Sequence, residues 1–114
     1  MIKNFLLSMT LLMFSGAVLA ADQEKGKRLV ELNNCASCHG ANLNSPIAPE
    51  YPKLAGQYGD YLFHAMLAYQ AKERRLVGRN HPIMVGQMAK FSRAELEDMA
   101  AYIASLPGDL TTKP

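Results

Sequence analysis

The sequence predicts a single all-α domain, and its apolar periodicity and length are the observations that predict it. Apolar residues recur at helical spacing in three segments, and no segment alternates apolar and polar residues long enough to indicate a strand. The 114 residues suffice for one domain but not two. Hydrophobic residues make up 49% and charged residues 19%, which favours a folded chain over a disordered one. The formal net charge of +2 is too small to indicate nucleic-acid binding.

Residues 1–20 are predicted to be a secretory signal peptide that is not part of the fold. Lys3 precedes an uncharged, apolar run that ends in the small residues Ala20 and Ala21. A basic start, an apolar middle and a small-residue end are typical of a cleaved export signal. The run is shorter than the ~20 residues that a membrane helix needs. We therefore expect a domain at residues 21–114, a periplasmic location and no integral membrane segment in the mature chain.

The first helix is predicted from Gln23 to Asn33, with Asp22 as its N-cap. Gly26 shares one face with Leu29 and Val30 at helical spacing. A glycine inside a helix costs about 1 kcal/mol relative to alanine. Gly26 therefore indicates either close packing against another helix or a glycine on the helix surface.

The middle of the domain is predicted to be irregular from Gly40 to Gly59, because three prolines within it exclude a long helix. A second helix follows from Asp60 to Glu73, on the evidence of apolar residues at helical spacing. Beyond it, a loop is predicted to carry Met84 and Met88.

The last helix has the strongest signals. Ser92 and Glu95 have the spacing of a capping box, and Pro107 with Gly108 stops the helix. Its predicted apolar stripe comprises Leu96, Met99, Ala100 and Ile103.

The most informative feature for function is the motif Cys35-Ala36-Ser37-Cys38-His39. On a helical turn the two cysteines lie on one face, so both thiols can reach the two vinyl groups along one edge of a haem. The histidine follows directly and can present its imidazole to the iron. This motif is the attachment pattern of c-type haem. We therefore expect one haem c, bound covalently through two thioethers to Cys35 and Cys38 and ligated by His39.

Other interpretations of the cysteine pair are weaker. A thioredoxin-like redox pair requires a preceding strand in a βαβ unit, and none is predicted. A zinc site requires a fourth ligand, but His64 and His81 are distant in the sequence. A disulfide between residues three apart would close a strained ring. His64 also faces away from the apolar stripe of its predicted helix, so we expect an ordinary helix histidine rather than a second haem ligand.

Several further segments carry a family resemblance, namely residues 35–40, 51–57, 84–88, 91–92 and 99–102. With them the chain resembles a small class I cytochrome c of the single-haem periplasmic c-553 kind. It is also similar to one half of bacterial two-haem cytochromes c. The resemblance covers nearly all of residues 22–107. It implies a cytochrome c class I fold, in which short helices wrap one haem with histidine and methionine axial ligands.

The resemblance also implies which methionine ligates the iron. The family's ligand lies seven residues before the Leu or Phe that precedes the cap of the last helix. Counting back from Phe91 gives Met84, and Met88 is the alternative. A thioether ligand raises the reduction potential of a histidine-ligated haem. The alternative role for either methionine is packing, because an isolated Met ordinarily only fills the core.

The resemblance also implies roles for two further residues, a proline and an arginine. A proline carbonyl after the motif accepts a hydrogen bond from the ring of the ligating histidine and fixes its tautomer. Pro49 is the first candidate for this role and Pro46 the second. Arg79 lies five residues before Met84 and matches an arginine that contacts a haem propionate; a solvated loop cation is the alternative.

Together these features predict a periplasmic one-electron carrier and not an enzyme. With His39 and Met84 both on the iron, no position is left for a substrate. The expected partners are redox proteins, such as a dehydrogenase, an oxidase or another cytochrome, and the expected state is a monomer. The alternatives are a haem subunit of a periplasmic dehydrogenase or oxidase complex, and an open-iron protein that binds ligands or acts like a peroxidase.

Overall fold

The computed structural model describes residues 20–72 and 78–110. Within these ranges there is no β-strand, so the all-α prediction is confirmed. The predicted signal peptide, apart from Ala20, lies outside the described residues. The helices of the described residues are α1 (Gln23–Leu32), α2 (Ala36–His39), α3 (Gly59–Ala68), α5 (Pro82–Met88) and α6 (Arg93–Ser105).

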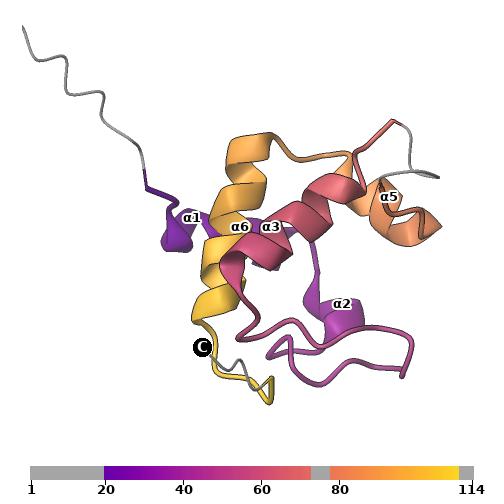
Figure 1. Ribbon diagram of the computed structural model, residues 1–114. Helices are drawn as coiled ribbons and strands as arrows, with labels where there is room; N and C mark the ends of the chain where they lie inside the picture. Colours follow the sequence, from indigo (N-terminus) through magenta and orange to yellow (C-terminus); the bar gives the residue numbers. More distant parts are fainter. Residues whose placement is uncertain (1–19, 73–77, 111–114) are drawn as a thin grey trace, which may run out of the picture.

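Three of these helices form the centre of the domain. Helix α6 packs against both α1 and α3, and Figure 1 shows α1 and α6 crossing with α3 alongside. The two short helices, α2 and α5, lie to one side of this centre (Figure 1). None of the helices in the described ranges has both the length and the apolar content needed to cross a membrane.

The crossing of α1 and α6 depends on Gly26. A Cβ atom at this buried position would lie 2.0 Å from the carbonyl oxygen of Asp98 and 3.0 Å from the backbone nitrogen of Met99. Only glycine allows two backbones to approach so closely. Asp98 is only 8% exposed, and its carboxylate accepts a 2.8 Å hydrogen bond from the backbone N–H of Asp22. Gly26 is therefore a packing glycine and not a surface one.

Both predicted N-caps are confirmed. Asp22 caps α1, since its carboxylate accepts from the backbone N–H of Lys25 at 3.1 Å. Ser92 and Glu95 form the complete capping box at the start of α6, with hydrogen bonds of 2.9 and 3.2 Å. These side chains satisfy backbone donors that have no partner inside the helix.

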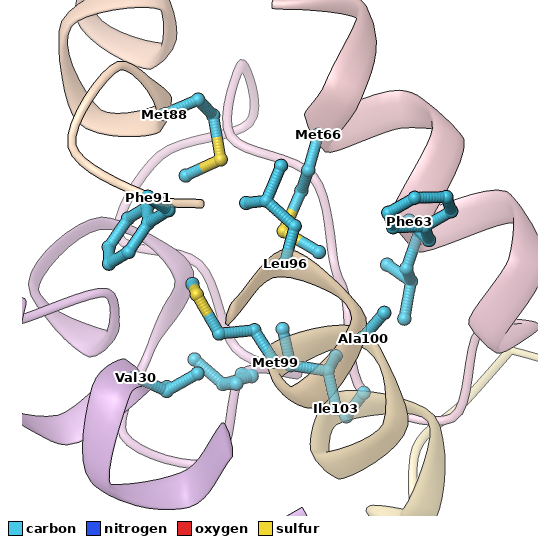
Figure 2. Packing of buried hydrophobic residues seen from close by; sticks show 12 residues of the cluster. Val30, Phe63, Met66, Met88, Phe91, Leu96, Met99, Ala100 and Ile103 are labelled. Atoms are coloured by element: carbon cyan, nitrogen blue, oxygen red, sulfur yellow. The ribbon is translucent and has the colours of Figure 1, made fainter. Parts of the chain in front are cut away.

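The hydrophobic core lies on the inward face of α6. Leu96 and Met99 are 0% and 1% exposed, and the whole predicted stripe of α6 is buried. Figure 2 shows these side chains meeting Val30 of α1, Phe63 and Met66 of α3, and Met88 of α5. The core therefore joins helices that are far apart in the sequence.

Two predicted elements differ from the structure. Helix α3 ends at Ala68, where residues 69–70 form a turn, so it is shorter than predicted; Glu73 lies outside the described residues. The segment predicted as a methionine-bearing loop is instead the helix α5, with Pro82 at its first position. Proline suits this position because it needs no intrahelical donor there and its φ is already helical. The helix propensity of Gly86 is low, but glycine costs only about 1 kcal/mol relative to alanine in a helix.

Candidate haem site

The cysteine motif forms α2, which follows α1 after a tight connection. Asn34 adopts a left-handed φ of 54°, and the backbone N–H of Cys35 donates to the carbonyl of Val30 at 3.3 Å. Asparagine tolerates this conformation better than most residues. Cys35 and Cys38 flank one helical turn, and both are half-buried and not joined by a disulfide. The motif thus has the helical geometry that the sequence predicts.

The turn after the motif requires glycine. Gly40 has a φ of +91°, and a Cβ atom there would lie 2.2 Å from the carbonyl oxygen of Ser45. Farther along, the carbonyl of Leu43 accepts from the backbone N–H groups of Leu54 and Ala55 at 2.8 and 3.0 Å. These contacts fold the irregular segment back, so that residues 52–55 lie close to the motif.

This fold places a carbonyl against the ring of His39. His39 is 6% exposed, and its Nδ1 lies 2.8 Å from the carbonyl oxygen of Pro52. A carbonyl can only accept, so Nδ1 is the donor in this hydrogen bond, and in the neutral imidazole Nε2 is the nitrogen with a free lone pair. The prediction that Pro49 supplies this carbonyl is wrong, and so is the second choice, Pro46. The hydrogen bonds that fold the chain back onto Leu43 determine which proline reaches the ring. The spacing of the prolines in the sequence does not reveal these hydrogen bonds.

The burial of Cys35 is unfavourable for a redox-active thiol. Desolvation raises the pKa of the Cys35 thiol above its ordinary value of 9.0. Redox-active cysteines have a lowered thiol pKa, because the thiolate is the nucleophile. The environment of Cys35 therefore disfavours the thioredoxin-like interpretation.

The two candidate methionines lie one helical turn apart on α5. Met88 is 3% exposed and packs within the core, where Figure 2 shows it beside Phe91 and Leu96. Met84 is half-buried and lies at the edge of the same core. Residues four apart on a helix share a face, so the two thioethers lie on the same side of α5, one in the core and one at its margin.

One residue near this helix was not anticipated from the sequence. Gln70, just beyond the end of α3, donates from Nε2 to the carbonyls of Met88 and Phe91, at 2.7 and 2.8 Å. Those carbonyls belong to the last residue of α5 and to the turn that follows it. No sequence signal marks this role, because a single glutamine past a helix end has no characteristic spacing.

The remaining residues singled out in the sequence are Arg79 and His64, which lie on or beside α3, and His81, which precedes α5. Arg79 is exposed, donates to the Tyr61 hydroxyl at 3.1 Å and lies over the rings of Tyr61 and Tyr69, with its Cζ 5.9 and 5.8 Å from their centroids. His64 is exposed, and its Nδ1 lies 2.8 Å from the carbonyl of Asp60 in the same helix. His81 is the exposed residue that precedes α5.

The donor set fits a haem better than a bare metal ion. Two half-buried thiols and one buried imidazole with a fixed tautomer match two thioether bonds and one nitrogen ligand. In contrast, no group of three or more His, Cys, Asp or Glu side chains in residues 20–72 and 78–110 is arranged to hold a metal ion.

Known proteins are similar to this chain in sequence and in overall fold. The family model for cytochrome c matches residues 23–107. The chain is 39% identical over 95 residues to a cytochrome c4 from Stutzerimonas stutzeri, covering 80% of this chain and 44% of the relative. It is 33% identical over 75 residues to cytochrome c-554(548) from Halomonas halodenitrificans, covering 66% of this chain and 87% of the relative.

A solved structure agrees with the sequence comparisons. The crystal structure of reduced recombinant cytochrome c4 from Pseudomonas stutzeri superposes with a TM-score of 0.68 and 35% identity, covering 80% of this chain and 48% of that one. The chain thus spans less than half the length of this cytochrome c4 and of the one from Stutzerimonas stutzeri. This relation confirms the resemblance to one half of a longer cytochrome. The matched motif, the helical fold and the family model together show that the chain belongs to the cytochrome c family, whose members carry covalently bound haem c.

Proposed function

We propose that this protein is a one-electron carrier with one haem c, joined to Cys35 and Cys38 and ligated by His39 and Met84. The observation that carries the proposal is the ring of His39, which is buried beside both cysteines and held through Nδ1 by the Pro52 carbonyl. Membership of the cytochrome c family supports electron transfer rather than substrate conversion. This chain has two cysteines in all, which supports a single haem attached through two thioethers.

The haem, when bound, supplies a reversible Fe(III)/Fe(II) couple. The work of the chain is to hold the ligands and exclude water. The carbonyl of Pro52 fixes the tautomer and the orientation of His39, and this leaves Nε2 as the ligating atom. A hydrogen bond of this kind also makes the ligating nitrogen more basic.

The arrangement of α5 supports Met84 over Met88 as the second ligand. The side chain of Met88 is enclosed by the core, and a change of its position would open a cavity beside Phe91 and Leu96. Met84 lies at the margin of the core and has a half-exposed side chain that can turn to a group outside it. Filling both axial positions would leave no iron site for a substrate.

Arg79 is proposed to contact a haem propionate. The hydrogen bond to Tyr61 and the two tyrosine rings hold the guanidinium in one place, yet leave other N–H groups available to an anion. Removing a cation beside the haem would favour the oxidised form. R79Q is therefore expected to lower the reduction potential, and R79K to lower it less; equal potentials in all three proteins would contradict this role.

The protein is proposed to act as a periplasmic monomer that exchanges electrons with protein partners. The signal peptide predicted at residues 1–20 supports the periplasmic location. The relatives support an exchange between redox proteins, because they are cytochromes themselves.

The visible spectrum of the exported protein tests the proposal. We expect a low-spin c-type spectrum with the weak red band of methionine-ligated Fe(III). M84A should lose that band, while M88A, a matched control with the same substitution, should keep it despite being less stable. H39A should give little stable holoprotein, because cofactor binding and folding are coupled in small domains. A high-spin wild-type spectrum that shifts readily with carbon monoxide would mean an open iron and would refute the carrier function.

A further inference from the structure

One side chain links the C-terminal end of α5, the helix that carries Met84, to the chain just beyond α3. Helix α5 has seven residues, and its last carbonyls have no partners within the helix. The Nε2 of Gln70 donates to two carbonyls at this end, those of Met88 and Phe91, at 2.7 and 2.8 Å. Both partners are carbonyl oxygens, so the amide nitrogen of Gln70 and not its amide oxygen makes these contacts. We propose that Gln70 is a positioning residue that holds α5 in place and thereby keeps Met84 on the haem iron.

The position of Gln70 makes this contact a link between separate parts of the chain. Gln70 follows the end of α3, and its own backbone N–H donates to Leu67 at 2.9 Å, so its main chain is fixed to that helix. Helix α3 is in turn packed on α6. The side chain is half-buried, and the shielding of its two hydrogen bonds from water makes their loss costly.

The contact acts on Met84 through the helix itself. Met84 lies four residues before Met88, which is about 6 Å along the axis of a rigid helix. The chain that leads into α5 is also tied to α3, three residues before the helix begins, since the backbone N–H of Arg79 donates to the carbonyl of Ala68 at 3.0 Å. Gln70 and this backbone bond therefore hold the methionine-bearing segment at both ends. Loss of Gln70 releases only the C-terminal end, so we expect α5 to open more often without the protein unfolding.

This inference rests on the proposed function, because it takes Met84 as the iron ligand. The probe is imidazole, titrated into the ferric holoprotein and followed by its visible spectrum. Imidazole binds only when Met84 has left the iron, so its apparent Kd falls as the opened population rises. Gln70→Met removes the donors at similar length, and we expect the Kd to fall about tenfold.

Three further variants separate positioning from a general loss of packing. Gln70→Lys retains N–H donors on a long side chain and should restore the Kd toward that of the wild type. Gln87→Met is the matched control: Gln87 is an exposed residue of α5 that only accepts from Lys90, so this change should leave the Kd unaltered. In the M84A background, Gln70→Met should have no effect, since no methionine is left to release. If Gln70→Met gives no folded holoprotein, Gln70→Asn, which is one methylene too short, takes its place in the same comparison.

The outcomes distinguish the two proposals. If M84A binds imidazole far more tightly than the wild type but Gln70→Met does not, the positioning role is overturned and the proposed function stands. The same holds if Gln70→Lys fails to restore the wild-type Kd. If the wild type and M84A bind imidazole equally, Met84 is not the ligand, and both the ligand assignment and the role of Gln70 are overturned.

Discussion

Replacing Gly26 with alanine sets two effects against each other. Intrinsic helix propensity favours alanine by about 1 kcal/mol. However, the added Cβ would lie 2.0 Å from the carbonyl oxygen of Asp98 and 2.5 Å from its carbonyl carbon, whereas ordinary contacts are about 3.5 Å. These are backbone atoms, so no side chain can turn aside, and α1 and α6 must separate by about 1.5 Å at the crossing. Overpacking of this kind costs up to about 3 kcal/mol. We expect a net loss of about 2 kcal/mol in the free energy of unfolding.

Thermal and urea denaturation of the holoprotein measure this effect. For a domain of this size the expected loss corresponds to a fall in Tm of about 8–16 °C. Gly59→Ala is the matched control, because a Cβ there meets only the Cβ of Ala104 at 3.7 Å and the carbonyl of Ala100 at 4.0 Å. This control should leave the stability nearly unchanged. A Gly26→Ala protein as stable as the wild type, or more stable, would refute the argument from backbone contact.

Three further predictions concern the turn after the motif, the core and the last helix. Gly40→Ala should lower the yield of covalent haem protein sharply, because a left-handed φ and a 2.2 Å contact with Ser45 both oppose a side chain; haem staining of the purified protein measures this. Leu96→Ala should destabilise the holoprotein by about 2–5 kcal/mol in urea titrations, since the side chain is 0% exposed. The Ser92 backbone N–H holds the pKa of Glu95 below its usual 4.5, so the carboxylate stabilises the fold fully above that pH and loses this effect as the pH falls through the lower folded pKa. In urea titrations down to about pH 3, the free energy of unfolding should therefore fall less on acidification for Glu95→Gln than for the wild type. Parallel plots of that free energy against pH would contradict the capping contribution.

The elements that the sequence predicted well are those with local signals. The caps at Asp22 and at Ser92 with Glu95 are made by residues three apart, and the stripe of α6 repeats with the helical period. The cysteine motif is similarly local. Helix α5 was missed because it is short and contains Gly86, so its propensity is weak and its packing against the core sets its structure.

The errors at the site have the same physical origin. Pro49 and Pro52 look alike in the sequence, and both could present a carbonyl to a nearby ring. The return of the chain at Leu43, through its bonds to Leu54 and Ala55, sets which of them reaches His39. Gln70 likewise contacts the end of α5 and the residue Phe91 beyond it across 18 and 21 residues of sequence, separations with no periodic signal.

The sequence by itself determined the chemistry of this protein. The spacing of Cys35, Cys38 and His39 predicts a haem c site, because attachment and ligation in this motif depend on residues within one helical turn. The tertiary structure alone decided the partners of those residues: the Pro52 carbonyl on His39 and the tie from Gln70 to α5. Such partners depend on the path of the backbone through turns and helix crossings, and long-range packing fixes that path rather than local preference.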